Sequence, residues 1–241
     1  MSVIIDNWAF LEHPDWRMKP TSDVPALFSG SRLGLVCPNN PDYRNYIGAQ
    51  IDDLYGRYEF DGAFFDMLFW RYVCGCPSCV KRLQDEEGIA LPDTLDWLDP
   101  GWCTFQTARE RWLAEFGQLL TDRSKAAKPG IEVYHNFATL QYSWEQGSSP
   151  EGSRASDFLG ADFYGDAAEQ LFMCKLFERL SRTRPIEFIT SRCPTPGFHE
   201  QVKSAEQMQL QVEAAVLASA AFMWIDAIDL DGGINPDIYR R

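Results

Sequence analysis

Short apolar runs rich in β-branched and aromatic residues alternate with longer segments of helical periodicity along this chain of 241 residues. One helix is expected to begin at Asn40, a residue suited to the N-cap, with Pro41 at its first position. The expected strands are residues 2–8, 62–69, 131–136, 159–164, 186–191 and 222–226, and further helices are expected at 78–87, 104–125, 168–180 and 204–220. Ser204 and Gln207 have the spacing of a capping box at the start of the last of these helices. Such alternation is typical of a parallel sheet whose strands are joined by helical crossovers.

Two parallel architectures compete, an open doubly wound sheet and a (β/α)8 barrel. The sequence has no G-x-G-x-x-G motif after a strand and no P-loop. Instead, polar residues stand at the ends of the expected strands, and in a barrel these ends meet at one face. They are Asp6, Asn7, Asp66, His135, Asn136, Asp162, Thr190, Ser191, Arg192 and Asp226. We therefore expect an α/β fold of the TIM-barrel type, a single domain over residues 1–241 that lacks its first one or two βα units because only six strands are found.

The composition argues against several classes of function. The chain is 45% hydrophobic, which suffices for a sizeable core, and its net charge of −13 disfavours binding to nucleic acid or to anionic membranes. No apolar run approaches the length of a membrane span, and the first residues do not resemble a signal peptide. The seven cysteines are an odd number and three of them are clustered, which favours a reducing compartment, and so the cytoplasm, over a disulfide framework.

The clustered cysteines form a C-x-C-x-x-C pattern just after an expected strand, at Cys74, Cys76 and Cys79. A tetrahedral zinc site needs a fourth ligand. Cys37 is a candidate, because a βα unit would return the chain near the end of that strand. The alternative is a set of free buried thiols.

Asp66 ends the apolar run Asp61-Gly-Ala-Phe-Phe-Asp66, so its carboxylate is expected at the tip of a buried strand. A carboxylate at that place in a barrel is a candidate catalytic group. The alternative is an aspartate that caps a helix or braces a loop.

Several motifs in combination resemble a known group of barrel proteins. They are Val36-Cys-Pro-Asn-Asn-Pro-Asp-Tyr-Arg44, Asp61–Asp66, Cys74–Cys79, Asp6-Asn-Trp8 with His13-Pro-Asp-Trp16, and Glu187-Phe-Ile-Thr-Ser-Arg-Cys193. Together they resemble the hypothetical glycosyl hydrolase family 6, whose relatives include α-L-fucosidases and family 42 β-galactosidases. The resemblance implies that the first strand here is the third of eight and that Asp66 closes the fourth.

The resemblance also implies roles. Asp66 matches the nucleophile of α-L-fucosidases, and Asp162 is preferred as the acid/base, with Glu187 as the second choice. Glu187 is otherwise a buried acid paired with Arg192 or Arg184. Family 42 enzymes end the matching strand in an Asn-Glu pair, and Met67-Leu68 after Asp66 disfavour their chemistry. Those enzymes hold zinc on four cysteines at positions that match Cys37, Cys74, Cys76 and Cys79, so a structural Zn²⁺ is expected.

Sugar sites need flat apolar platforms and polar side chains. The expected substrate-binding residues are Asp6, Asn7, Trp8, His13, Trp70, His135, Asn136, Tyr164, Arg192 and Asp226; Trp224 is expected to pack in the core. We expect a retaining exo-glycosidase for a fucoside or galactoside, with a homo-oligomer as one assembly state. The alternative is a catalytically inactive carbohydrate-binding or incomplete barrel. A metal-dependent hydrolase is disfavoured because His13, His135 and His199 lack ligand spacing.

Overall fold

The computed structural model describes residues 1–21, 33–137, 140, 144–195, 201–226, 228, 231–234 and 236. Of the residues named in the sequence predictions, His199 lies outside the described ones. Contacts divide the chain into two compact units, Met1–Asp157 and Phe158–Arg241. The expectation of one domain stays a prediction. No helix in the described part of the chain combines the length and apolar character that a membrane span requires.

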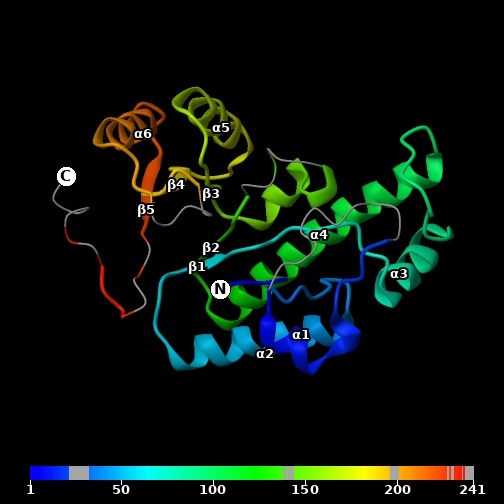
Figure 1. The fold of residues 1–241 in the computed structure, drawn as a ribbon. Coiled ribbons are helices and arrows are strands. Elements are labelled where there is room, and N and C mark those ends of the chain that lie inside the picture. Colours follow the sequence, from blue (N-terminus) through cyan, green and yellow to red (C-terminus); the bar gives the residue numbers. More distant parts are fainter. Residues whose placement is uncertain are drawn as a thin grey trace. The chain divides into compact units, whose positions relative to one another are not determined.

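The first unit is mainly helical and contains one pair of strands (Figure 1). Its elements are α1 (Asn7–Glu12), η1 (Pro14–Trp16), α2 (Pro41–Arg57), β1 (Gly62–Phe65), α3 (Pro77–Glu87), α4 (Pro100–Ala127), β2 (Glu132–His135), η3 (Trp144–Gln146) and η4 (Pro150–Ala155). The predicted cap of α2 is confirmed, because the side chain of Asn40 accepts hydrogen bonds from the N–H groups of Asp42 and Tyr43. Helix α4 packs on α2, and its inward face buries Trp112, Phe116 and other large residues.

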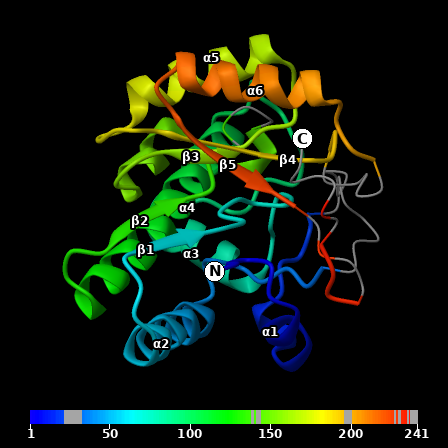
Figure 2. The ribbon, with the colours of Figure 1, turned by 90° about the vertical axis from the view of Figure 1, so that its left-hand side faces the viewer.

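The second unit consists of three strands and two helices, which are β3 (Gly160–Asp162), α5 (Ala167–Leu180), β4 (Glu187–Ser191), α6 (Ala205–Leu217) and β5 (Ala221–Ile225). Helices α5 and α6 lie side by side on one side of the strands in both views (Figures 1 and 2). The capping box predicted at the start of α6 is confirmed, since Ser204 and Gln207 exchange side chain to backbone hydrogen bonds. In the core of the unit, Phe163 stacks on Phe188 and lies tilted against Phe177.

The named strands of the described residues all pair in parallel, as the alternation of strands and helices predicted, and antiparallel pairing is limited to isolated bridges such as Ile5 with Leu35. β1 pairs with β2, and β4 lies between β3 and β5, so the order of strands in each sheet follows the order in the chain. This order is that of a βα barrel. The described residues form one sheet of two strands and one of three, and no complete barrel is seen among them.

The strand predicted at residues 2–8 was wrong for most of its length. Ser2 makes an isolated parallel bridge to Asp66, but Ile4 has a positive φ of 67° and α1 begins at Asn7. The carboxylate of Asp6 accepts a hydrogen bond from the N–H of Ala9 at 2.9 Å and so caps this helix. An N-cap of this kind starts a helix even where the apolar pattern is typical of a strand.

Candidate functional site

The candidate site begins with two side chains at the ends of neighbouring strands. Asp66 follows β1 and Asn136 follows β2, and the two strands pair in register, with Phe65 opposite His135. The side-chain amide of Asn136 donates to Oδ1 of Asp66 at 2.8 Å, and the backbone N–H of Met67 donates to the same oxygen at 2.9 Å. Both hydrogen bonds that the described residues donate to this carboxylate therefore go to Oδ1, and none of them goes to Oδ2.

Side chains alternate along β1 and β2, so each pair of opposite residues shares one face. Phe64 stacks on Tyr134 at 4.7 Å, on the face that also carries Asp66 and Asn136. Phe65 stacks on His135 at 5.2 Å, on the opposite face. There the ring of His135 is buried beside Thr121 of α4, with Nε2 and Oγ1 2.9 Å apart. The predicted substrate ligand His135 thus faces the helix layer rather than the side of Asp66.

The backbone around Asp66 is strained. Met67 has a φ of 67°, and Ile4 has the same value. Ile4 follows Val3, whose backbone N–H donates to the carbonyl of Asp66. A left-handed conformation is unfavourable for side chains of this size, especially the β-branched Ile4. Each such residue costs about 1–3 kcal/mol and persists only where the surrounding contacts enforce it, as is common near functional sites. The turn at Met67 also ends the predicted strand 62–69 four residues early, at Phe65.

The other predicted residues near the N-terminus have partners within the first unit. The side chain of Asn7 accepts a hydrogen bond from the N–H of Gly34 at 2.5 Å. Trp8 is 54% exposed and stacks on Tyr46 at 5.3 Å, while His13 stacks on Trp16. The exposed indole of Trp8 is the group here that most resembles a sugar platform.

Trp70, the other predicted platform in this unit, is fully buried. Its indole N–H donates to the carbonyl of Arg109 at 3.1 Å, and the guanidinium of Arg109 lies 5.7 Å from a ring of this indole. The structure therefore places Trp70 in the core, where it anchors the loop that follows Asp66.

The four predicted cysteine ligands come together. The sulfur atoms of Cys37, Cys74, Cys76 and Cys79 all lie within 4.8 Å of one another, and all four residues are buried. Cys37 precedes α2, whereas the other three lie between the Asp66 turn and the first turn of α3. All seven cysteines of the chain are free of disulfides. Four converging thiols can hold a metal ion.

Backbone and amide N–H groups point at these sulfurs. The N–H of Lys19 donates to Cys74, and Asn39 donates through its backbone to Cys37 and through its side chain to Cys79, each at 3.4 Å. Hydrogen bonds from the neighbouring thiols lower the pKa of Cys76, whereas burial raises the pKa of Cys37. N–H donors around a buried thiol set are the usual outer shell of a structural metal site, so these residues fit a metal ion.

The second unit carries the two candidates for the second carboxylate, at opposite ends of its sheet. Asp162 is the last residue of β3 and is level with Ile189, whereas Glu187 is the first residue of β4 and is level with Gly160. Two residues along a strand correspond to roughly 6.6 Å. Asp162 is therefore at the carboxyl end of the sheet, where parallel α/β folds place their sites, and Glu187 is at the other end.

Arg192 and Asp226 meet at the same carboxyl end. They form an ion pair with side chains that are only 9% and 11% exposed. Arg184 instead pairs with Glu178. Both arginines that were considered as partners of Glu187 thus have other carboxylates.

Lys203, which sequence reasoning missed, lies at this end as well. It is 5% exposed, and its ammonium donates to Oγ1 of Thr190 at 2.8 Å and to Oε1 of Gln211 at 3.0 Å. The predicted ligand Tyr164 contributes a ring 6.0 Å from this ammonium. No motif marks Lys203, because its burial depends on how β4 and α6 pack around it, which places Thr190 and Gln211, 13 and 8 residues away, against its ammonium.

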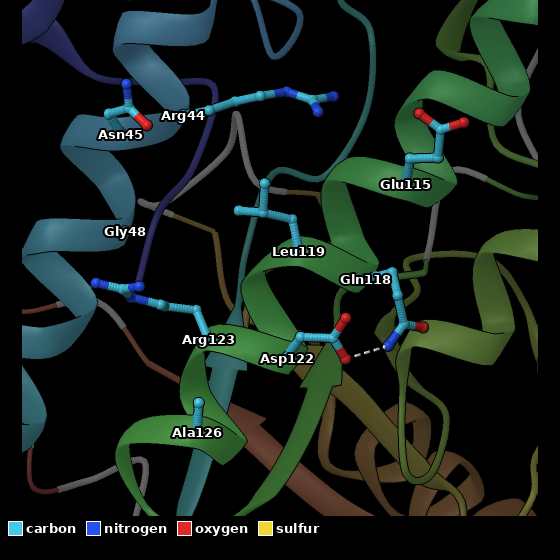
Figure 3. A pocket seen from close by; sticks show the side chains of 9 residues that line it. All are labelled: Arg44, Asn45, Gly48, Glu115, Gln118, Leu119, Asp122, Arg123 and Ala126. Atoms are coloured by element: carbon cyan, nitrogen blue, oxygen red, sulfur yellow. Dashed lines mark hydrogen bonds between the residues drawn. The ribbon is translucent and has the colours of Figure 1, made fainter.

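A separate hollow of about 640 Å³ lies between α2 and α4 (Figure 3). None of the predicted site residues lines it, and the dashed contact in Figure 3 joins Gln118 to Asp122 within α4 at 2.7 Å. Its walls are helical residues, namely Arg44, Asn45, Gly48, Glu115, Gln118, Leu119, Asp122, Arg123 and Ala126.

Comparison with known proteins gave structural but no sequence matches. No family model matches the chain, and no curated protein matches it. Among solved structures, α-L-fucosidase isoenzyme 2 from Paenibacillus thiaminolyticus has a TM-score of 0.71 at 18% identity, covering 99% of this chain and 35% of that one. The β-galactosidase from Bacillus circulans sp. alkalophilus has a TM-score of 0.74 at 16% identity, covering 98% and 43%.

The PgaB (BpsB) glycoside hydrolase domain from Bordetella bronchiseptica has a TM-score of 0.67 at 14% identity, covering 87% of this chain and 64% of that one. The chain thus spans between about a third and two thirds of these structures. At such identities the likeness concerns the fold alone. The chain has a mixed α/β fold similar to that of TIM-barrel glycoside hydrolases.

Proposed function

We propose that this chain belongs to a glycoside hydrolase that cleaves a fucoside- or galactoside-type bond with retention of configuration. The observation that carries the proposal is the carboxylate of Asp66 at the carboxyl end of β1, with Oδ1 held by Asn136 and neither of the two hydrogen bonds described above going to Oδ2. A carboxylate held in one orientation, with an oxygen that can attack the anomeric carbon, is what the nucleophile of a retaining glycosidase requires. The fucosidase and β-galactosidases among the structural neighbours support this class of substrate.

In the proposed reaction, Oδ2 of Asp66 attacks the anomeric carbon as the bond to the leaving oxygen breaks. A second carboxyl group gives its proton to that oxygen, and later takes a proton from the water that cleaves the glycosyl ester. The register of β3 and β4 favours Asp162 over Glu187 for this second role, because Asp162 is at the carboxyl end of its sheet.

The remaining parts of the proposal concern the substrate contacts, the metal site, the cellular compartment and the family. Asn136, Trp8, Tyr164 and Asp226 are proposed to contact sugar, and the four-cysteine site is proposed to hold a structural Zn²⁺. Closed tetrahedral sites of four thiolates are typical of zinc, and this one ties Cys37 to the loop that follows Asp66. Seven free cysteines are consistent with the cytoplasm. Membership of the hypothetical glycosyl hydrolase family 6 stays a proposal, as no family model matches.

The test is covalent trapping with 2-deoxy-2-fluoro fucosyl and galactosyl fluorides, read by intact mass. We expect one added sugar on the wild-type protein and none on Asp66→Asn. Asp162→Asn is expected to form the adduct, because fluoride leaves without an acid, but to release the sugar more slowly. Glu187→Gln serves as the matched control and is expected to behave like the wild type.

An adduct that persists in Asp66→Asn would refute the proposed nucleophile. No adduct on folded wild-type protein across both sugars would favour the alternative, a carbohydrate-binding barrel without catalysis. Slow release in Glu187→Gln, with normal release in Asp162→Asn, would exchange the two assignments.

A further inference from the structure

Lys203 is a buried cation whose described partners are all neutral. Two of its three N–H donors bond to the oxygens of Thr190 and Gln211. The rings of Tyr164 and Trp224 lie 6.0 and 5.8 Å from the ammonium. No carboxylate of the described residues forms an ion pair with it. One N–H donor of the ammonium is therefore left for a further acceptor.

A buried ammonium without a countercharge is unfavourable. The unfavourable burial of this charge is relieved either when the ammonium loses its proton or when an anion binds beside it. Burial lowers the pKa of Lys203 to about 8, which leaves the group mostly charged at neutral pH. An anion that bonds to the third N–H would raise this pKa again, and the gain would be available to binding.

The ammonium lines a pocket of about 350 Å³ between the start of α5 and one side of α6. This volume is within the range of small-molecule sites. The pocket wall contains a second charge, the carboxylate of Asp166, whose Oδ1 caps α5 by accepting from the N–H of Glu169. Gln207 and Leu210 of α6 complete the wall. The pocket thus offers one positive and one negative group on a partly apolar wall.

We propose that this pocket binds an acidic sugar, whose carboxylate pairs with Lys203 and whose hydroxyl donates to Asp166. A simple anion would satisfy Lys203 but would be repelled by Asp166, and a neutral sugar would leave the ammonium without a countercharge. Only a ligand with both a carboxylate and hydroxyl groups matches both charges. The choice of a sugar acid among hydroxy acids rests on the proposed function.

The experiment is isothermal titration of the whole chain at 0.15 M salt with D-glucuronate and D-galacturonate, and with D-glucose and D-galactose as matched neutral sugars. Salt at this level screens the net charge of −13 beyond about 8 Å. We expect the sugar acids to bind at least tenfold more tightly than the neutral sugars, because a hydrogen bond to a charged group is worth about that factor. Lys203→Met is expected to remove this preference.

Asp166→Asn is the second variant, since asparagine also caps a helix. It is expected to weaken sugar-acid binding and to strengthen binding of sulfate. Equal binding of acidic and neutral sugars, or unchanged glucuronate binding in folded Lys203→Met, would overturn the proposal. Stronger glucuronate binding in Asp166→Asn would overturn the part assigned to Asp166.

A measurement on the wild type alone tests the site even if a variant does not fold. Reductive methylation of Lys203, read by peptide mass, is expected to slow at saturating glucuronate and not with glucose. Equal methylation in both would count against the site. The titration and the methylation need no turnover. The sugar-acid site can therefore fail its test while the fluorosugars still trap Asp66, and it can pass while they do not, so failures of the two proposals are distinguishable.

Discussion

The unfolding free energy of this protein should fall on acidification because of His135. Thr121 donates its hydroxyl to the carbonyl of Ala155 at 2.7 Å, so towards His135 its oxygen must accept and Nε2 must carry the proton. Nδ1 then bears the lone pair, and it has no hydrogen-bond partner among the described residues. A proton added at Nδ1 would be buried without an acceptor, and burial lowers the pKa of His135 to about 3.

The sign and size of this change in unfolding free energy follow from the difference in proton binding between the folded and unfolded states. A histidine in the unfolded chain has a pKa of about 6.5, so between pH 6.5 and about 3 the unfolded state binds a proton that the folded state of His135 does not. Stability is therefore present above pH 6.5 and is lost as the pH falls. From pH 7 to pH 5 the loss from this one group is about 2 kcal/mol.

The assay is urea unfolding followed by tryptophan fluorescence at pH 7 and pH 5, for the wild type and His135→Gln. Glutamine does not titrate, and its amide can still donate to Thr121. We expect the wild type to lose about 2 kcal/mol more than the variant over this interval. Acid effects on the cysteine cluster are common to both proteins and cancel. Equal losses would refute the argument that His135 is held neutral in the fold.

Three further outcomes are expected. Removal of the metal by a chelator should lower the unfolding free energy, by about 2.7 kcal/mol if the free metal concentration had been a hundredfold above its Kd. Cys76→Ser should abolish metal binding as measured by native mass, whereas Cys103→Ser, which lies outside the cluster, should retain it. Gly147→Ala should lower the unfolding free energy by about 1 kcal/mol or more, because φ is 65° and the added Cβ would lie 2.4 Å from an indole carbon of Trp70. Gly130→Ala is the control: it also has a positive φ but open space around it, so it should lower the unfolding free energy less in the same urea titration. Asn40→Ala should cost about 1 kcal/mol through loss of the α2 cap, and Asn40→Asp, which keeps the cap, should cost little; equal losses would argue against capping as the cause.

Features with local causes were predicted well from the sequence. The cap and proline at Asn40 and Pro41 mark the start of α2, and Ser204 with Gln207 marks the start of α6. Such signals depend on hydrogen bonds within three residues, so the sequence nearby contains all of the information. The parallel strand order could also be inferred, because alternating strands and helices leave few other connections.

The cysteine cluster is an intermediate case. Cys74, Cys76 and Cys79 are close in the sequence, so their spacing alone indicates a shared site. Cys37 is assigned from a resemblance, and the fold brings its sulfur to the other three. The sequence provides the ligands, but only the return of the chain before α2 completes the set.

By itself, then, the sequence determined the helix starts, the parallel α/β class, the three clustered thiols and Asp66 at the end of a strand. The tertiary structure decided which face each strand residue occupies. It turned His135 towards α4, brought Asn136 to Asp66 across a separation of 70 residues, and buried Lys203 against Thr190. The physical reason is that these outcomes depend on strand register and helix packing, which arise from contacts between distant segments that no local pattern encodes.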